Sequence, residues 1–270
     1  MKNSCFDLLL FWESCMIFNR YFDFWKVKKM RILLIRHGDP DYEADSLTPK
    51  GWREAELLAQ RLAKYEIKEF YCSSLGRAKD TASLTLKKMG REAEICDWLR
   101  EFDASVLLPD GTQKGNCWDL MPSYWTGIEE LYDRKGWLET ELMRSGPAKE
   151  LFRQVADGID GILARHGYLR EGDIYRTSQG NRETLAFFCH FGVTCVILSH
   201  LLGISPVPLW HGFVAPPSSV TTLFTEEREK GIASFRCQSF GDISHLYAAD
   251  EPPAFAARFC ETYESFDERH

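Results

Sequence analysis

Short apolar runs recur along the chain, and each has the length of a buried β-strand. They cover residues 31–35, 69–72, 93–99 and 184–189, the third being the weakest. Such runs are typical of parallel strands, because both faces of a parallel strand are packed against other residues. Two more runs, at residues 219–225 and 232–237, flank a polar turn at 226–231 and predict a terminal pair of strands.

Helix signals lie between these runs. Thr48 is a suitable N-cap and Pro49 suits the first helical position, so a helix is expected to begin there. Ser74 is expected to cap a second helix, which Gly90 ends, and residues 193–202 predict a third. Strands that alternate with helices indicate an α/β fold. We expect a three-layer α/β/α sandwich around a mostly parallel central sheet.

Residues 101–172 interrupt this alternation. Residues 109–115 have the composition of a loop, aromatic side chains cluster in the segment, and residues 151–163 have helical periodicity. We expect an inserted, mostly helical lid over about residues 103–175. The chain would then contain one domain, residues 30–270, preceded by an extension at residues 1–29.

The extension has no place in the pattern of strands and helices. Asp7 and Glu13 bracket its apolar run and no small-residue cleavage site follows, so it is a poor signal peptide. One hypothesis is that translation begins at Met30, which directly precedes the first strand. The alternative is an aromatic-rich arm that packs on the domain or on a partner.

Charge narrows the classes of function. The chain of 270 residues has 33 basic and 40 acidic side chains and a net charge of −7. This balance argues against broad binding of nucleic acid or of anionic membranes. Residues 185–204 carry no charge and are long enough to span a membrane, but their pattern predicts a buried strand followed by a helix. We therefore expect neither a nucleic acid nor a membrane as partner.

The cysteines and histidines point to an intracellular protein without a metal. The nine cysteines are odd in number and include no C-x-x-C pair, so no disulfide framework is expected and the cytoplasm fits better. Most of them are expected to be buried small hydrophobes. No pair of histidines has the helical spacing of metal ligands, so no metal site is expected.

Polar side chains with one chemical theme follow the predicted strands. Arg36 and His37 follow the first strand, Arg77 begins the helix after the second, Glu101 follows the third, and His190 follows the fourth. Ligands of open α/β sheets bind at the carboxyl ends of the strands, so we expect these side chains to meet. Arginine matches phosphate oxygens, a neutral imidazole can attack phosphorus, and a carboxylic acid can protonate a leaving oxygen. The set therefore suits phosphoryl transfer.

Four motifs in order resemble the histidine phosphatase superfamily, which is also called phosphoglycerate mutase-like. They are R-H-G at 36–38, L-T-x-x-G at 47–51, S-S-L-x-R-A-x-x-T-A at 73–82, and His190. The resemblance covers about residues 30–225 and implies a phosphoglycerate mutase-like fold. It also implies that His37 attacks phosphorus and becomes phosphorylated, without a metal or an organic cofactor.

The same resemblance assigns the other roles. Arg36, Arg77 and His190 would bind the phosphoryl oxygens and stabilise charge in the transition state. Glu101 is similar to the family's proton donor, and Asp103 is the nearest competitor for that role. Water would then hydrolyse phospho-His37.

The residues after R-H-G depart from those of the mutases. Mutases continue with Glu or Gln and then Trp-Asn, whereas D-P-D-Y stands at residues 39–42 here. This departure favours the phosphatase branch of the family, and mutase-type transfer or a non-catalytic phosphate-binding protein remain alternatives. A cysteine-dependent phosphatase with C-x5-R is not expected, because only four residues separate Cys72 from Arg77.

The substrate is expected to be a small phosphomonoester. Trp118 and Trp125, in the expected lid, and His211 are candidates for the border of its pocket. Sugar phosphates, nucleotide-like phosphates and phosphoamino acids all fit the motifs. The oligomeric state is open.

Overall fold

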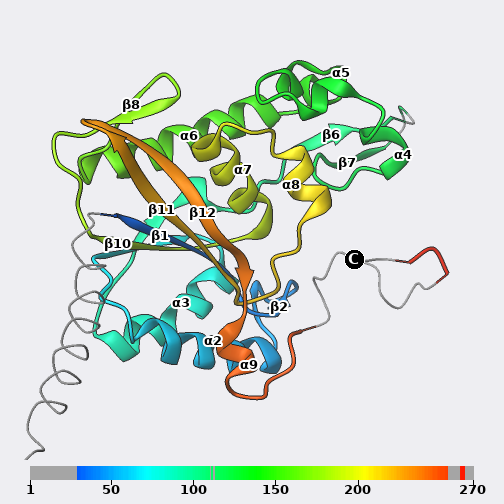
Figure 1. The fold of residues 1–270 in the computed structure, drawn as a ribbon. Helices are drawn as coiled ribbons and strands as arrows, with labels where there is room; N and C mark the ends of the chain where they lie inside the picture. The colour runs from blue at the N-terminus through cyan, green and yellow to red at the C-terminus, as the bar shows by residue number, and fades with distance from the viewer. Residues whose placement is uncertain (1–28, 110, 112, 255–261, 265–270) are drawn as a thin grey trace, which may run out of the picture.

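A computed structural model describes residues 29–109, 111, 113–254 and 262–264 (Figure 1). The expected extension at residues 1–29 lies outside the described residues except for Lys29. The strands are β1 (Arg31–Arg36), β2 (Pro40–Asp41), β3 (Ser46–Leu47), β4 (Glu69–Ser73), β5 (Glu94–Cys96), β6 (Ser105–Leu107), β7 (Lys114–Asn116), β8 (Leu169–Glu171), β9 (Ile174–Arg176), β10 (Thr184–Cys189), β11 (Val220–Glu229) and β12 (Ile232–Asp242). The helices are α2 (Pro49–Leu62), α3 (Gly76–Met89), α4 (Pro122–Trp125), α5 (Glu141–Arg144), α6 (Ala148–Arg165), α7 (Phe191–Leu202), α8 (Val207–Gly212) and α9 (Ser244–Tyr247). Short 3-10 helices are η2 (Asp97–Leu99), η3 (Glu129–Tyr132) and η4 (Gly136–Glu139).

The central sheet has the strand order β5-β4-β10-β1-β11-β12-β9-β8. β1 pairs in parallel with β10, β10 with β4, and β4 with β5. β11 and β9 run antiparallel to the other strands of this sheet. The expected mostly parallel sheet is therefore confirmed. The terminal pair β11–β12 is also confirmed, and it is longer than expected because β11 extends into the polar turn and β12 continues to Asp242.

Helices cover both faces of the sheet (Figure 1). Leu34 of β1 packs with the residues of α6 and α7, whereas its neighbours Leu33 and Ile35 pack with those of α2 and α3. Successive side chains of a strand point to opposite faces, so one apolar strand supplies both cores. Burying each such side chain contributes roughly 1.5–3 kcal/mol. The expected three-layer sandwich is confirmed.

The helix signals are mostly confirmed. The Thr48 hydroxyl accepts a hydrogen bond from the Gly51 N–H, and Pro49 opens α2. Gly90 and Gly203 end α3 and α7 in the left-handed conformation. The expected cap at Ser74 is wrong, because α3 begins at Gly76 and the carboxylate of Asp45 accepts the Gly76 N–H.

The weaker expectations are met in part. Of residues 93–99, only the stretch assigned to β5 is a strand, and the 3-10 helix η2 follows it. The charge-free residues 185–204 form most of β10 and the whole of α7, as expected. In the part of the chain that the structure describes, no helix is long and apolar enough to cross a membrane. Cys237 is exposed, and the other described cysteines are buried and unpaired.

Residues 103–175 contain more than helices. They form the hairpin β6–β7, the short helices α4 and α5, the long helix α6, and the hairpin β8–β9, which joins the central sheet. α6 lies beside α7 in one layer of the sandwich (Figure 1). The extent of a lid within this segment stays a prediction.

Two glycines in helical regions should respond to alanine in opposite ways. Gly90 has φ +63°, so Gly90→Ala should destabilise the fold by about 1 kcal/mol. Gly161 lies inside α6 on its exposed side, and a Cβ there would meet no atom within 4 Å. Gly161→Ala should therefore stabilise the fold by about 0.5–1 kcal/mol. Urea unfolding of both variants checks the two signs, and two shifts in the same direction would contradict the expectation.

Candidate active site

The carboxyl ends of β1, β4 and β10 bring the expected residues together. Arg36 ends β1, His37 follows it, and His190 follows β10. The ring centroids of His37 and His190 are 5.0 Å apart. Both imidazoles and the Arg36 guanidinium are buried, and Arg77 lies in the first turn of α3, close enough to depress the pKa of both histidines.

The His37 ring is fixed in one orientation. Its Nδ1 lies 2.7 Å from the carbonyl oxygen of Gly38, which can only accept, so Nδ1 carries the proton. The lone pair is then on Nε2. Burial, followed by the charge of Arg36, holds the pKa of His37 well below its usual range. The arrangement therefore presents a neutral imidazole with a nucleophilic Nε2 at neutral pH.

The glycines of the two first motifs pack backbone against backbone. A Cβ on Gly38 would lie 2.7 Å from the carbonyl oxygen of Gly51, and a Cβ on Gly51 would lie 2.2 Å from that of Asp39. The Gly38 N–H donates to the hydroxyl of Thr81 at 2.9 Å. The residues after His37 are thus pressed between the starts of α2 and α3, which explains why these positions need glycine.

An oxygen atom and an aromatic ring contact each of the two arginines. Arg36 Nη1 donates to the carbonyl oxygen of Ala215 at 2.6 Å, and the guanidinium lies over the Phe191 ring. Arg77 Nη1 donates to Asp45 Oδ1 at 2.7 Å, and the guanidinium lies over the Tyr42 ring. The buried Nε of Arg77 has no acceptor among the described residues. A bound oxyanion would satisfy it.

His190 is the N-cap residue of α7, and its side chain makes no capping hydrogen bond in the described structure. Its Nε2 lies 2.8 Å from the hydroxyl oxygen of Ser73, at the end of β4. Its Nδ1 is buried without a partner in the described part of the chain. Burial, followed by His37 and Arg77, holds the pKa of His190 well below its usual range. The positive end of the α7 dipole adds to a site that favours anions.

The structure separates the two candidate proton donors. Glu101 Oε1 accepts hydrogen bonds from the N–H groups of Phe102 at 2.8 Å and Val193 at 3.1 Å, at the start of α7. Burial raises the pKa of Glu101, so its carboxyl holds a proton more readily than usual. A Cβ on Gly192 would lie 2.6 Å from Glu101 Oε1, so the glycine makes room for this carboxyl. Asp103 is exposed.

The expected pocket border divides into two parts. Trp118 Nε1 donates to the carbonyl oxygen of Phe102 at 3.0 Å, which places Trp118 beside Glu101. Trp125 stacks on His211 with ring centroids 4.9 Å apart. Both nitrogens of His211 are engaged, because Nδ1 donates to the Val207 carbonyl at 2.8 Å and Nε2 accepts the Leu120 N–H at 3.0 Å. His211 thus ties α8 to the segment before α4.

Several residues that support the site are not evident in the sequence. Asp45 and Ser73 hold Arg77 and His190, and Ala215 holds Arg36 through its carbonyl. These partners lie in segments far apart along the chain. A local pattern carries no signal for them, apart from the position of Ser73 at a strand end.

Glu54 is the most unusual of these supports. Its side chain is fully buried, and its two carboxyl oxygens accept the N–H groups of Asp39 at 2.9 Å and Ala254 at 3.1 Å. Glu54 therefore joins the loop after His37 to the C-terminal segment. Burial raises the pKa of Glu54 to about 7.

Within the described ranges, no group of three or more His, Cys, Asp or Glu residues is placed to hold a metal ion.

The chain belongs to the histidine phosphatase superfamily, branch 1, whose family model matches residues 32–238. Among curated proteins, a probable phosphatase of Schizosaccharomyces pombe is 24% identical over 239 residues, which is 80% of this chain and 95% of that protein. Probable phosphoglycerate mutase GpmB of Serratia proteamaculans is 34% identical over 87 residues, which is 29% of this chain and 40% of that protein. The family expectation from the motifs is confirmed.

Solved structures show the same fold. An Entamoeba histolytica phosphoserine phosphatase mutant in complex with phosphoserine superposes with a TM-score of 0.53 at 20% identity, covering 80% of this chain and 99% of that one. A mycobacterial glucosyl-3-phosphoglycerate phosphatase gives 0.54 at 17% identity, covering 79% and 99%. At these sequence identities the likeness establishes the fold alone and does not extend to the substrates of those proteins.

The buried Glu54 carboxyl should make stability depend on pH. In the folded chain it keeps its proton up to about pH 7, whereas in the unfolded chain it ionises near its ordinary pKa of 4.5. The unfolded state therefore releases the proton first, and the free energy of unfolding should fall as pH rises through this window. From pH 5 to pH 8 the loss should be about 2 kcal/mol.

Glu54→Gln is the matched control for this measurement. It removes the titration, and all other groups are common to both proteins. Urea unfolding at pH 5 and pH 8 should show the wild type losing stability relative to Glu54→Gln. An equal difference between the two proteins at both pH values would contradict the prediction.

Proposed function

We propose that the chain is a phosphatase that hydrolyses a small phosphomonoester through a phosphohistidine on His37, without a metal or an organic cofactor. The observation that supports this most is the His37 ring itself. It is buried, neutral and oriented by Gly38 so that Nε2 carries the lone pair, and two arginines and His190 surround it. This is the arrangement that a nucleophile toward an anionic phosphate requires.

In the first step, Nε2 of His37 attacks phosphorus and the ester P–O bond breaks. The leaving oxygen takes the proton of Glu101, whose pKa is raised by burial, so that this carboxyl holds its proton more readily than a solvent-exposed one. Arg36, Arg77 and the N-terminus of α7 stabilise the charge on the phosphoryl oxygens. The step leaves phospho-His37, an alcohol and an ionised Glu101.

In the second step, Glu101 takes a proton from water and the resulting hydroxide attacks phosphorus. The P–N bond breaks, its electron pair returns to Nε2, and inorganic phosphate leaves. His37 is neutral again and Glu101 is again protonated. Both steps use the same carboxyl, first as acid and then as base.

Hydrolysis is favoured over mutase-type transfer. The D-P-D-Y continuation at residues 39–42 differs from that of mutases. A non-catalytic phosphate-binding protein is disfavoured because nucleophile and acid are both present. The small size of the ester and the cytoplasmic location stay predictions.

His37→Ala should abolish turnover of an aryl phosphate measured with a chelator present. Without the nucleophile we expect the rate to fall at least about 1000-fold. Brief reaction of the wild type should add one phosphoryl group to a peptide containing His37, with the acid lability of a P–N bond. Activity that survives in His37→Ala, or a label on another residue, would remove the mechanism.

Glu101→Gln should slow an alkyl phosphate on the order of 100-fold or more, because an alkoxide must be protonated as it leaves. A nitrophenyl phosphate should be slowed much less, since nitrophenolate leaves without an acid. For the wild type, the rate with the alkyl ester should fall as pH rises through the raised pKa of Glu101. Asp103→Asn, at the exposed competitor, is the control and should leave both rates nearly unchanged. The reverse result would assign the acid to Asp103.

A further inference from the structure

Basic side chains gather at the edge of the sheet opposite the candidate active site. They line one cavity, of about 1380 Å³, near the starts of β1 and β10, and they are Lys29, Arg31, Lys64, Lys68, Arg91, Arg182 and Arg236. We call it the basic cavity. The carboxylates that share its lining are those of Glu66, Glu183 and Glu226. The chain as a whole has a net charge of −7, so this excess of positive charge is local to the cavity.

The strand register places three of these side chains, those of Lys68, Arg31 and Arg236, in a row. Arg31 pairs with Thr184 of β10 on one side and with Phe224 of β11 on the other. The Lys68 N–H donates to the Thr184 carbonyl at 2.8 Å, and Phe224 pairs with Arg236 of β12. With neighbouring strands about 4.8 Å apart, the row from β4 to β12 is about 19 Å long. These three cations therefore lie in line across the strands.

Most of these cations have no carboxylate partner. In the described part of the chain, no ion pair is made by Lys29, Arg31, Lys64, Lys68 or Arg182. The Arg31 guanidinium lies 5.2 Å from the ring centroids of both Tyr65 and Phe224. Within the ranges that the structure describes, Arg91 donates to the carbonyl oxygens of Ile67 and Lys68 and to no carboxylate. Arg236 differs, because it pairs with Glu226.

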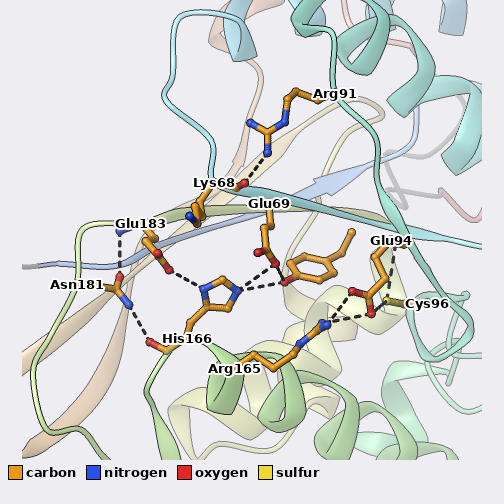
Figure 2. A network of polar contacts seen from close by, with 10 residues as sticks. Lys68, Glu69, Arg91, Glu94, Cys96, Arg165, His166, Asn181 and Glu183 are labelled. Carbon is orange, nitrogen blue, oxygen red and sulfur yellow. Dashed lines mark hydrogen bonds and ion pairs between the residues drawn. The ribbon is translucent and has the colours of Figure 1, made fainter.

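Two of the three carboxylates that line the cavity, Glu183 and Glu226, already have partners. Figure 2 shows Glu183 and Glu69 on either side of the His166 ring, where Glu183 Oε2 lies 2.5 Å from Nδ1 and Glu69 Oε2 lies 3.3 Å from Nε2. Glu94 pairs with Arg165 at 2.9 Å in the same view. Glu183 is thus bound to His166 and Glu226 to Arg236, so the seven cations of the lining outnumber its three carboxylates and the cavity is positive.

We propose that the basic cavity binds a small molecule that carries several linked phosphates, at a site separate from the active site. A single exposed ion pair contributes little, so a lone phosphate should bind weakly, whereas a chain of phosphates can engage several cations of the row at once. The rings of Tyr65 and Phe224 already pack against Arg31. The phosphates should therefore carry the affinity, and a nucleoside should add little to it.

Calorimetric titration of the full-length protein with inorganic tripolyphosphate tests the site. We expect saturable binding that weakens as salt is raised, because the contacts are between charges. Lys68→Gln combined with Arg182→Gln should weaken it about 10-fold, and both side chains are exposed, so the fold should persist. Lys135→Gln combined with Arg153→Gln is the matched control, with the same change in charge at exposed positions outside the cavity.

The outcomes separate this site from the alternatives. Loss of tripolyphosphate binding in Arg77→Gln, with the Lys68 and Arg182 variant unaffected, would assign the binding to the active site. Equal weakening in the cavity and control variants would show that binding of tripolyphosphate depends only on net charge, which would overturn the proposal. Absence of binding at low salt would also overturn it. A nucleoside triphosphate that binds at least about 10-fold tighter than tripolyphosphate would overturn recognition by phosphates alone.

Discussion

The parallel pairing of β1 with β10 is the constraint on which the site depends. Its register sets Arg36 opposite Cys189, so the next residue of each strand, His37 and His190, emerges beside the other. A slip of one residue would turn every side chain of β1 to the other face of the sheet. The close packing of Leu33, Leu34 and Ile35 opposes that slip, because side chains of different shape would have to exchange between the two cores. The packing of apolar side chains on β1 therefore positions His37 and His190, which take no part in that packing pattern.

Burial gives these groups their character. In water an imidazole would be partly protonated near its ordinary pKa, but burial among arginines keeps His37 and His190 neutral. The same burial raises the pKa of Glu101 and so favours the protonated acid. One environment thus pushes a base and an acid toward the protonation states that phosphoryl transfer needs.

The two edges of the sheet hold positive charge in a related way. Arg36 and Arg77 lie over Phe191 and Tyr42 near the active site, and Arg31 lies between two rings at the opposite edge. Guanidinium is weakly hydrated and planar, so an aromatic face can hold it without neutralising its charge. Near the active site, Asp45 balances that charge in part, whereas at the basic cavity Glu183 is bound to His166.

The sequence alone determined the elements whose signals are local. Apolar runs located β1, β4 and β10, Thr48 and Gly90 located helix ends, and the residues after each strand located His37, Arg77, Glu101 and His190. Tertiary structure decided what depends on distant segments. Asp45 rather than Ser74 caps α3, and Asp103 faces solvent. Both ring nitrogens of His211 form hydrogen bonds with backbone groups, and Glu54 is buried against Asp39 and Ala254. Strand and helix signals arise from neighbours along the chain, whereas a side chain's partners and its exposure to water arise only when the layers close.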